Sequence, residues 1–132
     1  MITKKVLLLL ITPMLFLTAC SSGTTSAITN LDASSFSSLI SGDEVTVIDV
    51  RTADEFLSGH IAKAINIDVE ASTFNDLVSK LNKSKKYAVY CHSGRRSAIA
   101  TSKMSDLGFS SVNNLNGGVE QWIASGFTLT TQ

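Results

Sequence analysis

The stretch of this sequence best suited to covalent chemistry is a cysteine followed by a polar, doubly basic segment. Cys91 ends an apolar run at residues 87–90, and after it come His92, Ser93, Gly94, Arg95, Arg96 and Ser97. The run has the β-branched and aromatic content of a strand, and residues 98–107 are compatible with a helix. Cys91 is therefore expected at the carboxyl end of a strand, where open α/β sheets place their reactive groups.

A helix that begins near Arg96 or Ser97 would direct its positive end and the free N–H groups of the loop at the Cys91 sulfur. Such donors favour the thiolate, which is the nucleophilic form of cysteine. Gly94 lets the backbone approach the sulfur because it has no Cβ. The pattern predicts that Cys91 is a nucleophile in an anion-binding loop.

The side chains after Cys91 suit a small anionic sulfur donor such as thiosulfate. The guanidinium groups of Arg95 and Arg96 offer planar, charge-assisted donors. Ser97 could cap the following helix. His92 adds positive charge only near or below about pH 6.5, so we hypothesise that donor preference depends on its protonation.

Strands and helices are expected to alternate around this loop. Strands are predicted at residues 28–31, 45–50, 64–68, 87–90 and 111–115. Helix caps are predicted at Asp32, at Thr52 with Glu55 as a capping box, and at Ser72. A chain of 132 residues is about one domain by length. The alternation predicts an α/β fold with a mainly parallel sheet.

Arg51 lies at the carboxyl end of the predicted strand 45–50, beside the cysteine loop. Asp49 and Arg51 are expected to organise that strand end, although Arg51 could also add positive potential to the site. His60 is interpreted as a hydrogen-bonded structural residue. Two histidines and one thiol at these spacings make no recognisable zinc site, so we expect neither a metal nor a cofactor.

The amino-terminal segment has the order of charges and apolar residues found in secretory signals. Lys4 and Lys5 precede an apolar stretch at residues 6–17, and Leu17-Thr18-Ala19-Cys20 follows. That tetrapeptide resembles the lipobox of bacterial lipoproteins, which implies lipid on Cys20. The expected organisation is a signal peptide at 1–19, a flexible tether at 20–27 and a folded domain at 28–132.

The lipobox resemblance implies an exported lipoprotein of the bacterial cell envelope, on the periplasmic face of a membrane if the cell is Gram-negative. An ordinary signal peptide or an uncleaved anchor is the alternative. Lipidation of Cys20 would leave Cys91 as the only free thiol. The chain has 11 basic and 11 acidic residues, and removal of Lys4 and Lys5 leaves a net charge of −2, which gives nucleic-acid binding no support.

Three segments together resemble the rhodanese family of sulfurtransferases. They are residues 47–67 with the Asp-Val-Arg and Gly-His-Ile-Ala runs, the Cys91 loop, and residues 107–126 with Gly117-Gly118 and Trp122. The resemblance implies about five strands with helices on both faces. It also favours Arg96 over Arg95 as the anion contact, because the family keeps an arginine before this serine. Departures lie at the turn positions Lys63, Asp68 and Thr128.

The family resemblance implies a sulfurtransferase in which the Cys91 thiolate takes a sulfane sulfur from thiosulfate or a persulfide and passes it to a thiophilic acceptor. That acceptor is a small molecule or a protein thiol, and the chain is expected to be a monomer. One alternative is a noncatalytic binding module at the cell envelope. Another is a phosphatase or arsenate-type enzyme, but such loops place arginine six positions after cysteine, where this chain has Ser97.

Overall fold

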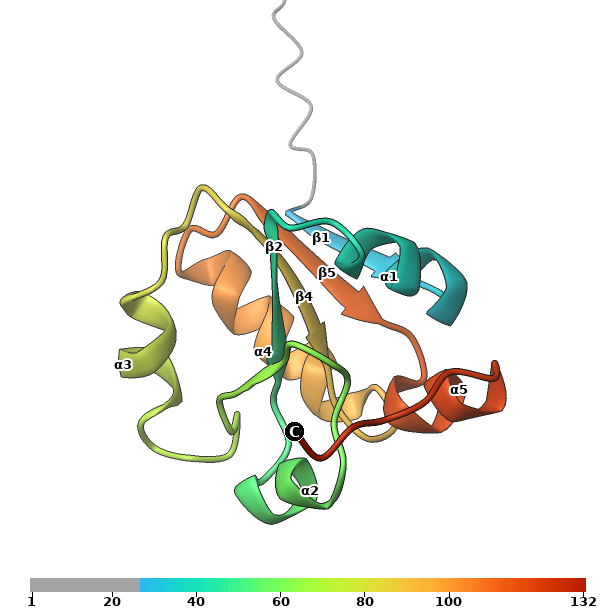
Figure 1. Ribbon diagram of the computed structural model, residues 1–132. Helices are drawn as coiled ribbons and strands as arrows, with labels where there is room; N and C mark the ends of the chain where they lie inside the picture. The colour runs from blue at the N-terminus through green and yellow to red at the C-terminus, as the bar shows by residue number, and fades with distance from the viewer. Residues whose placement is uncertain (1–26) are drawn as a thin grey trace, which may run out of the picture.

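Five parallel strands in the order β1-β5-β4-β2-β3 form the centre of the computed structural model, which describes residues 27–132 (Figure 1). The strands are β1 (Ile28–Leu31), β2 (Val45–Asp49), β3 (Ile65–Asn66), β4 (Lys86–Tyr90) and β5 (Ser111–Leu115). The helices are α1 (Ala33–Ile40), α2 (Ala53–Ser58), α3 (Phe74–Ser79), α4 (Arg95–Asp106) and α5 (Gly118–Ala124). The predicted α/β fold with a parallel sheet is confirmed.

The predicted signal peptide, the lipidation site Cys20 and residues 20–26 of the tether lie outside the described residues. Within residues 27–132, no helix has the length and apolar character that a bilayer crossing requires.

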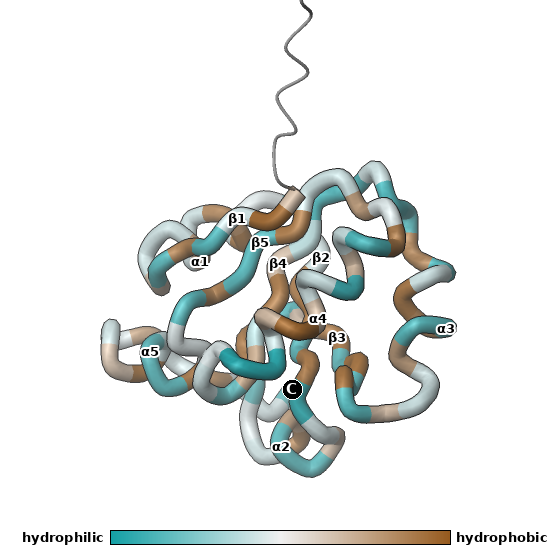
Figure 2. Tube along the Cα trace, turned by 180° about the vertical axis from the view of Figure 1, so that it is seen from behind, coloured by the Kyte–Doolittle hydropathy of each residue, from teal (hydrophilic) through white to brown (hydrophobic). Residues whose placement is uncertain are grey.

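Alternation along β4 divides the core between the two faces of the sheet. Tyr87 and Val89 pack with residues of α3 and α4, whereas Ala88 and Tyr90 pack with residues of α1 and α5. Successive side chains of a strand point to opposite faces, so a continuous apolar run is expected where helices cover both. Figure 2 shows hydrophobic residues along β4. Cys91 continues the alternation and belongs to the α4 side.

Local hydrogen bonds explain where the first two helices begin. The Asp32 carboxylate accepts the Ser35 N–H at 2.7 Å, as predicted for the start of α1. Thr52 and Glu55 form the predicted capping box of α2. The predicted cap at Ser72 is wrong, because Thr73 precedes α3 and its side chain makes no capping bond.

The predicted strand at 64–68 is longer than β3. Ala64 is still part of a turn, since its N–H donates to the Ile61 carbonyl at 3.1 Å. Lys63 in this turn has a φ of 67°, the only positive φ of a non-glycine residue within the described chain. The turn therefore delays the strand until Ile65.

Candidate active site

The Cys91 loop lies where β4 ends and α4 begins, at the carboxyl edge of the sheet. Cys91 is almost fully buried, with 1% of its surface exposed. The Gly94 N–H donates to the Cys91 Sγ at 3.0 Å, which closes the loop around the sulfur. A backbone donor this close stabilises negative charge on sulfur.

Ser97 adds a second polar group beside the sulfur. The thiol donates to the Ser97 hydroxyl oxygen at 3.4 Å, and that hydroxyl donates to the Gly94 carbonyl at 3.2 Å. A hydroxyl hydrogen rotates freely, so Ser97 could donate to the sulfur once Cys91 loses its proton.

The prediction that Ser97 is the N-cap of the helix is wrong. α4 begins at Arg95, and its N-cap is Gly94 with a φ of 102°. Gly94 adopts this left-handed backbone because it lacks a Cβ, and so the helix starts earlier than the serine would indicate. Ser97 consequently lies inside the first turn, buried against the sulfur.

The loop rests on the amino-terminal end of α5. The Val119 N–H donates to the Cys91 carbonyl at 2.9 Å, and the Glu120 N–H donates to the His92 carbonyl at 3.1 Å. Gly118 has a φ of 57°, and a Cβ there would collide with the Cys91 carbonyl oxygen and lie 2.6 Å from the His92 carbonyl carbon. Only glycine permits this approach, so Gly118 is a positioning residue for the loop.

Arg96 forms a two-point ion pair with Glu55 of α2. Its two terminal nitrogens donate to the two Glu55 oxygens at 2.8 Å each. This bond is the main cause that raises the pKa of Arg96 and lowers the pKa of Glu55 to about 2. The attraction between Arg96 and the Cys91 sulfur also raises the pKa of Arg96. Each terminal nitrogen keeps a second N–H beside its bond to Glu55, so a contact of Arg96 with an anionic donor stays a prediction.

Arg51 is also held by a carboxylate. Its guanidinium donates to Asp49 at 2.6 Å and to the Gly59 carbonyl at 2.7 Å. Burial is the largest single influence and opposes the charge on Arg51, but the bond to Asp49 and the nearby negative charges together outweigh it, so the pKa of Arg51 is raised. The pair fits the expected organising role at the end of β2, and a direct contribution of Arg51 to the site stays a prediction.

The outer part of the loop is exposed. His92 lies 3.2 Å from Glu120 of α5, and both side chains are more than half exposed. Ser93 and Arg95 are also exposed. His60 lies away from the loop, with its ring nitrogens 2.9 Å and 3.2 Å from the carbonyls of Phe56 and Gln132, as expected of a structural histidine.

The family model of the rhodanese-like domain matches residues 32–125, which include strands β2 to β5, the cysteine loop and α5. This chain belongs to the rhodanese-like family. The curated relatives include thiosulfate sulfurtransferase 18 of Arabidopsis thaliana, 34% identical over 97 residues that cover 64% of this chain and 71% of that protein. A sulfurtransferase of Allochromatium vinosum is 28% identical over 103 residues, with coverages of 77% and 94%.

Solved structures agree with the family assignment. A rhodanese-related protein from Thermoplasma volcanium matches with a TM-score of 0.70 and 34% identity, covering 79% of this chain and 99% of that one. A rhodanese-like domain protein from Staphylococcus aureus matches with a TM-score of 0.67 and 27% identity, with coverages of 79% and 98%. The predicted rhodanese fold is therefore confirmed.

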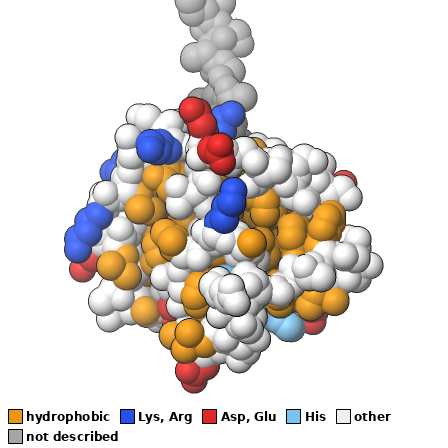
Figure 3. All heavy atoms as spheres, in the orientation of Figure 1, with side chains coloured by type: hydrophobic (Ala, Val, Ile, Leu, Met, Phe, Trp, Pro, Cys, Tyr) orange, Lys and Arg blue, Asp and Glu red, His pale blue; other side chains and the backbone are white. Residues whose placement is uncertain are grey.

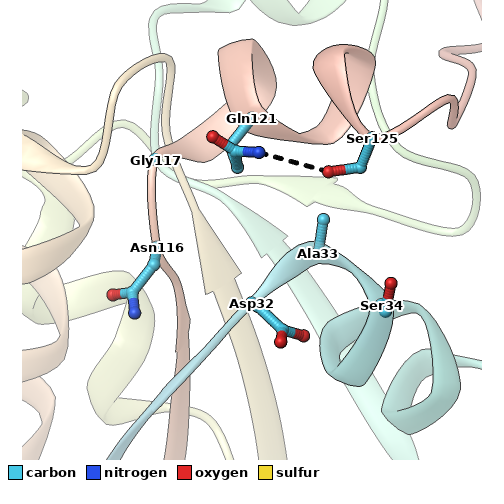
Figure 4. A pocket seen from close by; sticks show the side chains of 7 residues that line it. All are labelled: Asp32, Ala33, Ser34, Asn116, Gly117, Gln121 and Ser125. Atoms are coloured by element: carbon cyan, nitrogen blue, oxygen red, sulfur yellow. Dashed lines mark hydrogen bonds between the residues drawn. The ribbon is translucent and has the colours of Figure 1, made fainter.

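A hollow adjoins the Cys91 loop at the same edge of the sheet. It has a volume of about 380 Å³, and its lining comes from the start of α1, the turn after β5 and α5 with the residue that follows it: Asp32, Ala33, Ser34, Asn116, Gly117, Gln121 and Ser125 (Figure 4). Gly117 lies between this hollow and the loop. It packs closely on Gly94, since a Cβ added to Gly94 would lie 3.2 Å from the backbone nitrogen of Gly117. Cys91 does not line the hollow, so we do not assign the reaction to it.

The residues around the rhodanese loop include several that sequence reasoning missed. From the sequence, Glu55 is assigned only to a helix cap and Gly118 is named only within the family resemblance, while Glu70 and Glu120 are not singled out. Their positions follow from tertiary contacts, although the Gly117-Gly118 pair was a visible signal of an unusual backbone. Within residues 27–132, no three His, Cys, Asp or Glu side chains are grouped so as to hold a metal ion.

Proposed function

We propose that this rhodanese-like domain is a sulfurtransferase that forms a persulfide on Cys91. The observation that carries the proposal is the Cys91 Sγ held within the loop, 3.0 Å from the Gly94 N–H and 3.4 Å from the Ser97 hydroxyl. Sulfurtransferase names among its relatives support the same reaction class.

The reaction has two displacement steps. The Cys91 thiolate attacks the outer sulfur of thiosulfate, the sulfur–sulfur bond of thiosulfate breaks, and sulfite leaves with the bonding electrons. A thiophilic acceptor then attacks the outer sulfur of the enzyme persulfide, and the Cys91 thiolate is released. A persulfide donor would react in the same way with a thiolate as the leaving group. Free N–H groups in the first turn of α4 would stabilise the negative sulfur in each state.

Burial of Cys91 limits what can react. With 1% of the residue exposed, a donor must insert its terminal sulfur into the loop. A slender sulfane sulfur fits this requirement. The absence of a second thiol in the described domain means that the acceptor must come from outside it.

Intact mass spectrometry of the full chain in detergent tests the proposal. Incubation with thiosulfate should add one sulfur atom, cyanide should remove it, and Cys91→Ser should not gain it. If no sulfane donor adds sulfur to the wild-type chain, the sulfurtransferase proposal is wrong, and a noncatalytic binding module at the cell envelope becomes the favoured interpretation.

We further propose that lipid on Cys20 anchors the domain to a membrane of the bacterial cell envelope. The support is the sequence Leu17-Thr18-Ala19-Cys20 after an apolar stretch. Several acyl chains on one residue give firm anchoring, because each buried CH₂ contributes about 0.8 kcal/mol. Cys20→Ala should release the protein from membranes. Retention of that variant on membranes would contradict the lipid anchor.

A further inference from the structure

The charged side chains near the Cys91 loop are mostly paired. Arg96 is bound at two points by Glu55, and Glu70 lies 4.0 Å from the same guanidinium. Glu120 lies 3.2 Å from His92. Arg95 is exposed and forms no ion pair within the described chain.

These pairs leave little positive charge for a donor. Two arginines, Arg95 and Arg96, stand against the three carboxylates Glu55, Glu70 and Glu120, so this group carries one net negative charge when the His92 imidazole is neutral. The buried pair of Arg51 with Asp49 adds no net charge. On the face seen in Figure 3, acidic and histidine side chains show along the lower edge, toward which the strands of Figure 1 run, whereas the basic side chains lie over the upper and left parts together with further acidic ones.

We infer that the site selects sulfane donors with one negative charge, such as organic thiosulfonates and persulfides, over dianionic thiosulfate. This inference rests on the proposed sulfurtransferase activity. Backbone N–H groups supply partial positive charge to the transferred sulfur of either donor. The second charge of thiosulfate, however, has only Arg95 as an unpaired cation among the described side chains of the loop, and the carboxylates of Glu70 and Glu120 lie beside Arg96 and His92.

Methanethiosulfonate and thiosulfate make a matched pair of donors, because a methyl group replaces one charged oxygen. The Cys91 thiolate attacks the terminal sulfur of either donor and the sulfur–sulfur bond breaks. The leaving group is methanesulfinate from the first and sulfite from the second. In both cases the product is the Cys91 persulfide anion, so charge and atoms balance without a further reactant.

The experiment measures kcat/KM of the full chain with both donors at about pH 8, where an imidazole is neutral. We expect kcat/KM for thiosulfate to rise with ionic strength, because salt screens repulsion, and the logarithm of kcat/KM for the singly charged methanethiosulfonate to rise about half as much. For an assumed separation of ~7 Å between a carboxylate and the donor charge, Coulomb's law in water gives about a threefold effect per unit charge at low salt. Glu120→Gln and Glu70→Gln should therefore each shift the ratio about threefold in favour of thiosulfate.

Glu44→Gln is the matched control, because it removes the same charge just before β2, at the opposite edge of the sheet. It should leave the donor ratio unchanged. A fall of thiosulfate kcat/KM with salt, or unchanged ratios in Glu120→Gln and Glu70→Gln, would overturn the charge selection while the activity stands. Failure of both donors to load Cys91 would overturn the proposed function together with this inference.

Discussion

Replacing Gly118 by alanine should disturb the Cys91 loop although Gly118 lies outside it. The new Cβ would collide with the Cys91 carbonyl oxygen and approach the His92 carbonyl group within 2.6 Å. The backbone of the loop must then move away from α5. The two hydrogen bonds from Val119 and Glu120 that hold the loop would lengthen or break.

Gly126→Ala is the matched control for backbone strain. Gly126 has a φ of 88°, and a Cβ there meets no atom within 4 Å. A residue with a side chain tolerates the φ of 57° at Gly118 better than the φ of 88° at Gly126, because the left-handed region centres near +50° to +70°. Strain alone therefore predicts that Gly126→Ala is the more damaging of the two changes.

The contact with the loop should reverse that order. A left-handed alanine costs ~1–2 kcal/mol, and the loss of glycine freedom in the unfolded chain returns ~0.4–1 kcal/mol. Gly126→Ala should therefore lower the free energy of unfolding by about 1 kcal/mol. Overpacking against the loop adds ~1–3 kcal/mol at Gly118, so that variant should lose about 2–4 kcal/mol.

Urea unfolding followed by the fluorescence of Trp122, the single tryptophan of the chain, measures both losses. Trp122 lies in α5 and is buried, so its signal reports the packing of that helix. The rate of sulfur loading on Cys91 should fall at least tenfold in Gly118→Ala and stay near wild type in Gly126→Ala. Equal stability losses and equal loading rates in the two variants would refute the positioning role of Gly118.

Three further predictions concern single side chains. The pKa of Glu55 is lowered from 4.5 to about 2, so its pair with Arg96 stabilises the fold fully above about pH 4.5 and is lost as the pH falls toward 2. Because the Glu55 side chain is 34% exposed and solvent screens the pair, Glu55→Gln should cost only about 1–2 kcal/mol at pH 7. Urea unfolding at pH 7 and near pH 2 should show the difference from wild type shrinking, and a constant difference would contradict it. Lys63→Gly should raise the free energy of unfolding by up to about 1 kcal/mol, because it removes the strain of a φ of 67°. The urea midpoint should rise accordingly, and a lower midpoint would contradict this. Ser97→Ala should slow sulfur loading about five- to tenfold by removing a hydrogen bond worth ~1 kcal/mol or somewhat more, and rapid-quench mass analysis showing an unchanged rate would exclude that role.

The strands and the first two helix starts were predictable because their signals are local. The strand pattern at 111–115 and the cap at Asp32 depend on residues within a few positions of each other, and both agree with the structure. The start of α4 was harder to predict from the sequence. Gly94 adopts a left-handed cap, and so a glycine and not the nearby serine sets the first residue of that helix.

The ionic environment of the loop could not be read from the loop sequence. Arg96 meets Glu55, which lies 41 positions earlier in α2, and only the folded sheet brings the two together. The capping box already explained Glu55 locally, so nothing in the sequence required a second partner for it. The same carboxylate oxygen serves both contacts, accepting from Thr52 and from Arg96.

This sharing connects the start of α2 with the start of α4, and it makes the charge of the loop a property of the fold. A count of basic residues after Cys91 predicts an attractive site for a dianion. With Arg96 paired to Glu55 and His92 beside Glu120, the same residues give a site with little net attraction. Two chains with identical loop sequences would therefore differ in donor preference if the carboxylates at positions such as 55, 70 and 120 differed. The elements that face a rhodanese loop must be included when its specificity is inferred.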